Sequence, residues 1–123
     1  MDIQNAIQQI NAEFMELYEQ RDAAGIAAAY VENGAILAPN QHAHRGRLAL
    51  EDFWKGFFSE IGGGASIKQV EIAGEGDLAY QWATYSLEGG TQSDAGKFVE
   101  IYKRQADGSW KIRLTIFNSD NPA

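Results

Sequence analysis

The chain has 123 residues, of which 45% are apolar, and it carries a formal net charge of −7 and no cysteine. The missing cysteines exclude disulfides and thiolate metal sites and fit a reducing compartment, so we expect a cytoplasmic protein. The negative charge disfavours binding to nucleic acid or to an anionic membrane, because both need basic surface. No apolar run approaches the roughly 20 residues of a membrane span, and the N-terminus lacks the pattern of a signal peptide, although a processed secreted form would look the same.

The N-terminal half of the chain has the period of helices. Apolar residues at spacings of three and four predict a first helix, formed around Ile3, Ile7, Ile10, Phe14 and Leu17. Asp2 is placed to cap this helix, and Asp22 is placed to cap a short second helix that carries Ile26 and Tyr30. A third helix follows with a wide apolar stripe, which consists of Leu50, Phe53, Trp54, Phe57, Phe58 and Ile61.

Between the second and third helices the sequence predicts a turn at Asn33-Gly34, a strand over 35–38 that ends at Pro39, and a polar loop over 40–46. Three glycines, 62–64, then separate the helical half from a half whose period is two. Strands are expected at 66–73, 78–87, 96–105 and 109–117, with turns at 74–77, 89–90 and 107–108. Helices followed by a meander of long strands predict an α+β domain over residues 1–123, with an antiparallel sheet and the helices on one face.

Two of these strands are apolar on both faces. The opposed sets are Phe98 and Tyr102 against Val99 and Ile101, and Leu78, Tyr80 and Trp82 against Ala83, Tyr85 and Leu87. Helices cover only one face of a sheet, so a second subunit is the simplest cover for the other face, and we expect a homodimer. The alternative is that twist and the stems of Lys97 and Lys103 shield it.

Several short motifs occur in order: RDAAGI at 21–26, GAILAP at 34–39, RG at 45–46, GDLAY at 76–80, DAGKFVEIYKR at 94–104, DGSWKI at 107–112 and IFNSD at 116–120. Together they resemble the SnoaL-like and ketosteroid-isomerase-like families of the nuclear transport factor two-like superfamily, over nearly the whole chain. The resemblance implies a cone-shaped domain in which a strongly curved sheet wraps the N-terminal helices and a pocket opens at one end. Members of that superfamily include isomerases, cyclases, dehydratases and association domains, so the fold alone does not assign a function.

Three pocket positions carry the chemistry in ketosteroid isomerases, and the resemblance implies which residues of this chain correspond to them. The carboxylate base before the proline corresponds to Ala38, and the tyrosine of the first helix corresponds to Phe14, so neither is kept. The carboxylic acid on a later strand corresponds to Glu100. Moving a proton beside a carbonyl needs a positioned base and an oxyanion donor, so isomerisation by the usual residues is not expected.

Glu100 is the main candidate for a catalytic or binding group. On the face of Phe98 and Tyr102 it would be a carboxyl among aromatic rings, with its pKa raised by burial. The alternative is that Glu100 faces solvent or pairs with a basic residue such as Arg113. His44 is a tentative second catalytic residue, since it lies with His42 in a loop expected to border the pocket mouth. The pair lacks a third ligand at a suitable spacing, so no metal and no other cofactor is expected.

The remaining candidates are expected to line an apolar pocket of roughly a few hundred Å³. They are Phe14, Tyr18, Ala38, His42, Trp54, Phe57, Tyr80, Trp82, Phe98, Tyr102 and Asn118. For most of the aromatic residues, ordinary core packing is the competing interpretation. Two hypotheses follow: a protein that binds or transforms a small apolar or amphipathic organic molecule, and an association module whose interior is filled by its own side chains.

Overall fold

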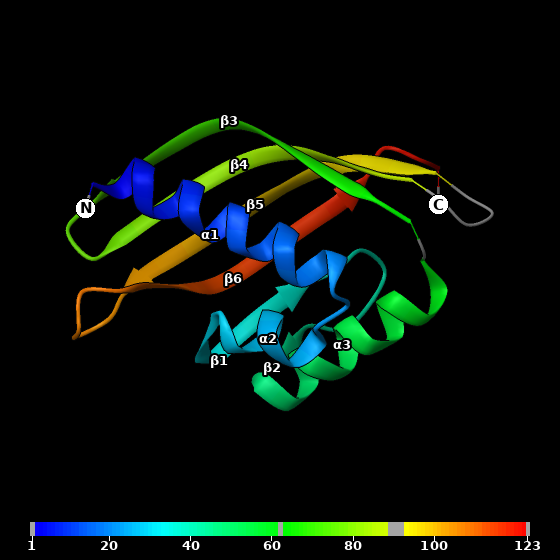
Figure 1. Cartoon of the computed structure of the whole chain (residues 1–123), viewed down its shortest axis with the longest axis horizontal. Coiled ribbons are helices and arrows are strands. Elements are labelled where there is room, and N and C mark those ends of the chain that lie inside the picture. The colour runs from blue at the N-terminus through cyan, green and yellow to red at the C-terminus, as the bar shows by residue number, and fades with distance from the viewer. Residues whose placement is uncertain (1, 62, 89–92, 123) are drawn as a thin grey trace.

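The computed structural model describes residues 2–61, 63–88 and 93–122. Within them the chain forms three helices and a six-stranded sheet (Figure 1). In chain order the elements are α1 (Ile3–Glu19), α2 (Ala23–Ala28), β1 (Tyr30–Leu37), β2 (His44–Arg45), α3 (Arg47–Glu60), β3 (Ala65–Glu75), β4 (Leu78–Leu87), β5 (Asp94–Arg104) and β6 (Trp110–Ser119). No helix among these residues is long and apolar enough to cross a membrane.

Both predicted N-terminal caps are confirmed. The carboxylate of Asp2 accepts a hydrogen bond from the backbone N–H of Asn5, at 2.7 Å. The carboxylate of Asp22 accepts one from the N–H of Gly25, at 2.9 Å. Each bond satisfies one of the backbone donors that a helix start leaves free, so these two side chains fix where α1 and α2 begin.

The strands follow the order β2-β1-β6-β5-β4-β3 in one curved sheet that bends around α1 (Figure 1). The pairs β3–β4, β4–β5 and β5–β6 are antiparallel, as the meander of long strands predicts. The pair β1–β6 is parallel, which the long connection between them allows, since α3 and four strands separate these two segments in the chain. The α+β fold is therefore confirmed, with one parallel pair in a sheet that was expected to be wholly antiparallel.

The segment between α2 and α3 differs from the prediction. Tyr30 opens β1 instead of closing α2, and Asn33 and Gly34 lie inside that strand rather than in a turn. The register of β1 against β6 shifts between Tyr30 and Ala35, so an irregularity in the strand accommodates the Asn-Gly pair. His44 and Arg45, expected in a loop, pair with β1 as the short strand β2. The turn predicted at 89–90 lies outside the described residues.

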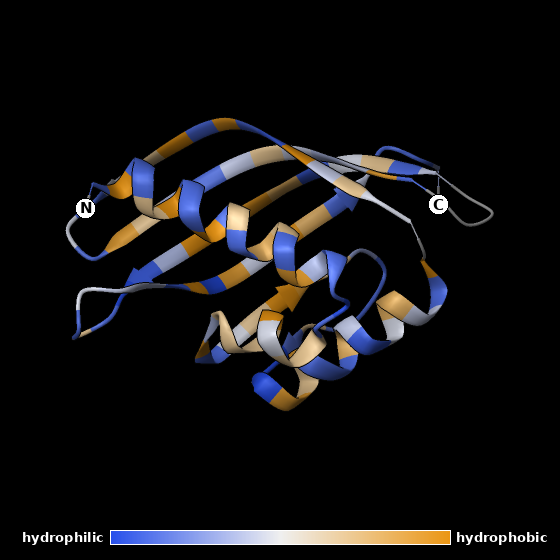
Figure 2. Ribbon diagram, viewed as in Figure 1, coloured by the Kyte–Doolittle hydropathy of each residue, from blue (hydrophilic) through white to orange (hydrophobic). Residues whose placement is uncertain are grey.

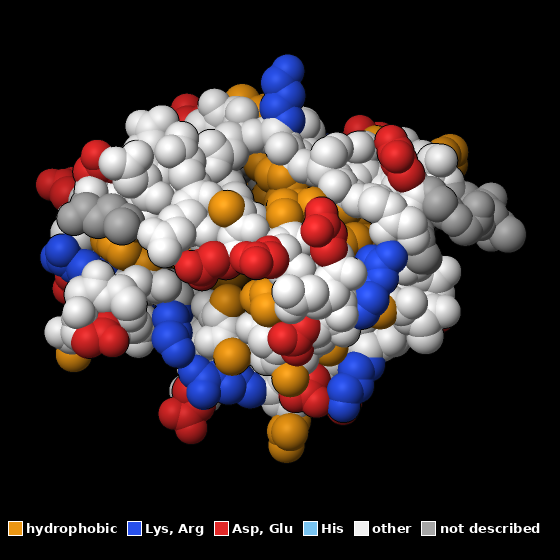
Figure 3. Space-filling view, in the orientation of Figure 1, with side chains coloured by type: hydrophobic (Ala, Val, Ile, Leu, Met, Phe, Trp, Pro, Cys, Tyr) orange, Lys and Arg blue, Asp and Glu red, His pale blue; other side chains and the backbone are white. Residues whose placement is uncertain are grey.

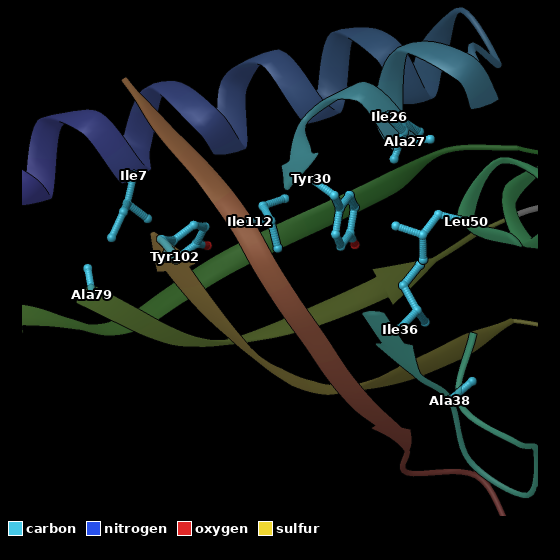
Figure 4. Close-up of a cluster of buried hydrophobic side chains, with 10 residues drawn as sticks. All are labelled: Ile7, Ile26, Ala27, Tyr30, Ile36, Ala38, Leu50, Ala79, Tyr102 and Ile112. Carbon is cyan, nitrogen blue, oxygen red and sulfur yellow. The ribbon is translucent and has the colours of Figure 1, made fainter. Parts of the chain in front are cut away.

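The core lies between the helices and the concave face of the sheet. Figure 2 shows apolar residues recurring along α1, and of these Ile7 is fully buried while Phe14 and Leu17 pack against the central cluster. Figure 4 shows that cluster, in which Tyr30, Ile112 and Tyr102 form one row across β1, β6 and β5. This packing covers much of the concave side of the sheet with apolar and aromatic side chains.

Candidate functional site

A cavity of about 110 Å³ lies between the helices and the concave face of the sheet. Its described lining comprises Ile10, Phe14, Tyr18, Tyr30, Ile36, Phe53, Trp54, Phe57, Ala65, Ser66, Ile67, Tyr85, Leu87, Asp94, Phe98, Glu100, Ile112, Thr115 and Phe117. Figure 3 shows apolar side chains gathered in a hollow between α1 and β3, elements that both contribute to this lining. The volume is smaller than the few hundred Å³ expected, and it approaches the roughly 150 Å³ that holds a benzene molecule in an engineered cavity.

The helix side of the cavity is aromatic. Helical spacing places Phe14 and Tyr18 four residues apart on α1, where they meet Trp54 and Phe57 of α3. The ring centroids of Phe14 and Trp54 are 5.5 Å apart and those of Trp54 and Phe57 are 5.1 Å apart, with tilted planes. Such edge-to-face pairs hold one another in place, so the wall is rigid as well as apolar.

The sheet side carries a row of three polar residues. In the register of the sheet, Gln81 of β4 lies opposite Glu100 of β5, and Glu100 lies opposite Thr115 of β6. Residues that are opposite each other on adjacent strands point to the same face, so all three side chains project from the concave face. The sheet thus delivers a carboxyl group, an amide and a hydroxyl to one place in an otherwise apolar interior.

Both oxygens of the Glu100 carboxyl accept hydrogen bonds from hydroxyl groups. Tyr102 Oη donates to Oε1 at 2.8 Å, and Thr115 Oγ1 donates to Oε2 at 2.6 Å. These donors have partners of their own: the amide of Gln81 donates to Tyr102 Oη, and Tyr30 Oη lies 2.7 Å from Thr115 Oγ1. The network is arranged so that its protons point toward Glu100.

A paired amide completes this network on the helix side. Gln81, which is fully buried, exchanges two hydrogen bonds with Asn11 of α1, at 2.7 and 3.1 Å. A buried amide without partners would cost the fold free energy, so this pair fixes the Gln81 amide and joins α1 to β4. Glu100 is therefore held by a network of groups that are themselves fixed, from four strands and one helix.

The titration of Glu100 is set by two opposing effects. Burial, the larger effect, raises the pKa of its carboxyl above the ordinary value of 4.5, while the hydrogen bonds from Thr115 and Tyr102 act to lower it. Burial, together with the charge of Glu100, also raises the pKa of Tyr102 and of Tyr30. Both phenols therefore stay protonated at neutral pH and act as donors.

The charged residues of the cavity wall are of one sign. Asp94 is the second carboxylate of the described lining, and it accepts hydrogen bonds from Ser119 Oγ and, at 3.3 Å, from Tyr85 Oη. No lysine, arginine or histidine occurs among the described lining residues. Two buried donors that belong to lining residues, Tyr18 Oη and Trp54 Nε1, have no acceptor within the described part of the chain.

The comparisons with known proteins bear on this arrangement. The family model that describes the SnoaL-like domain matches residues 12–113 of the sequence. The chain belongs to the SnoaL-like domain family. No curated protein sequence matches it at a significant level.

Solved structures show the same fold for this SnoaL-like domain. A ketosteroid isomerase-like protein from Erwinia carotovora atroseptica superposes with a TM-score of 0.86 at 17% identity, covering 96% of both chains. A domain of unknown function with a cystatin-like fold from Nostoc punctiforme gives 0.82 at 15% identity, covering 98% of this chain and 78% of that one. A protein from Thiobacillus denitrificans described as a calcium/calmodulin-dependent protein kinase type II association domain gives 0.76 at 20% identity, covering 88% and 90%.

The structure brings part of the predicted pocket together. Of the predicted lining residues, the cavity contacts Phe14, Tyr18, Trp54, Phe57 and Phe98, together with Glu100. Tyr102 lies behind the wall and reaches the site through its bond to Glu100. The alternative for Glu100 does not hold, since the carboxyl lies on the concave face while Arg113 is exposed.

Four other predicted residues, apart from the two histidines, do not lie at the cavity. Tyr80 and Trp82 are 37% and 38% exposed on the convex face, because Gln81 and Ala83 take the buried positions of β4. Asn118 is exposed near the end of β6, and Ala38 is buried in the core outside the described lining.

Neither histidine of the SnoaL-like domain reaches the cavity wall. His42 is exposed, and His44 Nε2 lies 2.8 Å from Gln41 Oε1. The His44 ring packs on Phe53, with centroids 5.0 Å apart, and Phe53 is the residue that lines the cavity. The expected role of His44 as a catalytic residue is therefore not supported by its position. No group of three or more potential metal ligands occurs among the residues described.

The sequence prediction missed four residues of the polar network: Asn11, Tyr30, Gln81 and Thr115. Gln81 alternates with Trp82, which was expected to line the pocket, so the pattern of β4 suggested the wrong face. Thr115 alternates with the exposed apolar residue Ile116, so the pattern of β6 did not mark it as a buried position. A polar residue at the same level as Glu100 on both neighbouring strands was the available signal, but it required the strand register.

Proposed function

We propose that this SnoaL-like domain binds a small apolar or amphipathic organic molecule in the cavity, with the Glu100 carboxyl as its polar anchor. The observation that carries the proposal is a carboxyl group held by two hydroxyl donors at the wall of an aromatic cavity. Sites for small molecules combine an apolar lining with a few fixed polar groups in this way.

The proposal is one of binding, and the chemistry available at the site is proton exchange. Glu100 is able to hold or release a proton, and the hydrogen bond from Thr115, itself bonded to Tyr30, is able to orient the carboxyl group. The positions that resemble the isomerase base and oxyanion donor hold Ala38 and Phe14, which carry no ionisable group. A steroid-type isomerisation is therefore not part of the proposal.

The test is an NMR titration of the ¹⁵N-labelled protein with neutral, cationic and anionic organic compounds of up to about eight non-hydrogen atoms, a size suited to a small cavity. We expect at least one compound to cause saturable shifts confined to the lining. The variant Ala65→Phe fills the cavity and should abolish them, whereas Ala73→Phe, at an exposed position of the same strand, should leave them intact. Wild-type protein that responds to no compound would overturn the proposal.

We also propose a homodimer formed through the convex face of the sheet. Trp82, Val99 and Ile116 lie in one row across β4, β5 and β6 and are each more than a third exposed. Contiguous exposed apolar surface of this kind is typical of protein contacts. Light scattering coupled to gel filtration should show a dimer that Val99→Lys dissociates and that Leu48→Lys, on α3, does not. A wild-type monomer at micromolar concentration would contradict it.

The second candidate function is an association module that forms this dimer and takes no ligand. The exposed row on the convex face favours it, and one structural neighbour is described as an association domain. The two candidates differ in the titration: the association module predicts a dimer whose lining resonances respond to none of the compounds. A cytoplasmic location is kept as a proposal and is supported by a chain with no cysteine.

A further inference from the structure

We infer that the cavity selects a small organic cation, such as a methylated ammonium compound, over neutral or anionic molecules of the same shape. The inference rests on the proposed function, since it names the class of molecule that the Glu100 cavity binds. It follows from three features of the wall: a carboxyl group without a basic partner, aromatic rings opposite it, and a volume suited to very few atoms.

The first feature is the charge of Glu100. Its hydrogen-bond partners, Tyr102 and Thr115, are neutral, and no lysine, arginine or histidine occurs among the described lining residues. The other charged residue of that lining, Asp94, has the same sign. A buried carboxylate without a counter-charge is costly, and the cost is removed either by a proton or by a cation in the cavity. An anion would face two carboxylates and no positive group.

The second feature is the aromatic wall across from the sheet. Phe14, Trp54 and Phe57 come from the helices, whereas Glu100 comes from β5, so a molecule in the cavity lies between rings and carboxyl. Aromatic rings attract cations, and the attraction grows when water is excluded. The same helical cluster already binds one cation: the Arg21 guanidinium lies 5.1 Å from the ring centroid of Tyr18 and 5.3 Å from that of Phe58.

The third feature is size combined with polarity. A cavity of about 110 Å³ admits a molecule of few atoms, comparable with the single ring that fills a slightly larger engineered cavity. The charged groups of the described lining are Glu100 and Asp94, so the polarity of this small cavity is acidic. A short molecule with an ammonium group, as in choline, matches the size of the cavity, its carboxyl and its aromatic rings.

A cation competes with a proton for Glu100, which makes its affinity depend on pH. The titratable or polar groups that face the carboxyl are Gln81 from β4, Tyr102 from β5, Thr115 from β6 and, through Thr115, Tyr30 from β1. None of them is cationic, and both phenols keep their protons because their pKa is raised. Affinity for a cation should therefore increase with pH as Glu100 ionises, whereas affinity for a neutral compound should not.

The experiment compares three compounds of nearly one shape: choline, 3,3-dimethyl-1-butanol, in which carbon replaces the nitrogen, and 3,3-dimethylbutanoate. Dissociation constants are measured by calorimetry or NMR at pH 7 with the wild type, Glu100→Gln and Glu75→Gln. Glu75→Gln changes the net charge equally at an exposed position outside the cavity. We expect choline to bind wild type roughly tenfold or more tightly than the alcohol. That preference should disappear in Glu100→Gln and persist in Glu75→Gln.

A pH series on the wild type keeps the inference testable even if Glu100→Gln fails to fold. Choline affinity that rises between pH 5 and 8, with the alcohol unchanged, supports the inference. Equal or tighter binding of the alcohol or the anion would overturn the cation preference while leaving the proposed binding function in place. No binding by any of the three would also overturn the inference, and the wider compound panel would then decide separately on the binding function.

Discussion

Replacing Glu100 by glutamine should change how the stability of the fold depends on pH. Because burial raises the pKa of this carboxyl above 4.5 in the folded state, the folded protein binds the proton more tightly than the unfolded chain. The contribution of Glu100 to stability is thus complete below about pH 4.5 and is lost as the pH rises through the folded-state pKa. Between these two values the free energy of unfolding falls by up to about 1.4 kcal/mol per pH unit.

The assay is urea denaturation of wild type and Glu100→Gln at half-unit steps from pH 4 to 8. The difference between the two proteins cancels the other carboxylates, so only the titration of residue 100 remains. We expect this difference to change steadily above pH 4.5, with wild type losing stability relative to the variant, and then to level off. Two stability curves that run parallel over the whole range would refute the reasoning, because they would mean that Glu100 titrates as an exposed residue.

Three further changes test the packing by the same denaturation assay. Tyr102→Phe removes one donor to Glu100 and should cost about 1–3 kcal/mol, whereas an unchanged stability would mean that this bond contributes little. Gly96→Ala should destabilise the fold by about 1–3 kcal/mol, because a Cβ there would overlap the backbone oxygen of Asn118. Gly56→Ala, with open space around it in α3, should stabilise the fold by about 0.5–1 kcal/mol. Effects of the same sign in these two variants would contradict the structure. Asp22→Ala should cost about 1 kcal/mol through loss of the α2 cap, and no loss would mean that water replaces that bond.

The sequence predicted those parts of the fold that depend on local patterns. The helical spacing of residues in α1, the caps Asp2 and Asp22, and the alternation in β3 to β6 all act within a few residues of one another. The turn predicted at Asn33-Gly34 was wrong because this segment pairs with β6, a strand about 80 residues away, and that pairing overrides a local preference for a turn.

The candidate site likewise contains residues that the sequence predicts and residues that depend on long-range pairing. Glu100 was identified because it corresponds to the carboxylic acid of the ketosteroid isomerases that the sequence resembles, and because it lies between Phe98 and Tyr102 on an apolar strand face. Tyr80 and Trp82 were placed at the cavity because large aromatic residues favour burial, but the face of a strand is set by its register with the whole sheet. Gln81 then takes the inward position, where Asn11 satisfies its amide, and no pattern within β4 contains that partner.

The account depends most directly on a buried Glu100 carboxyl that contacts a bound small molecule. The ¹³C resonance of this carboxyl, followed by NMR against pH with and without choline, reports both its burial and its contact with the bound molecule. The account predicts a titration midpoint above 4.5 in the free protein and a lower midpoint when choline is bound. A midpoint at the ordinary value that no compound of the panel moves would contradict it.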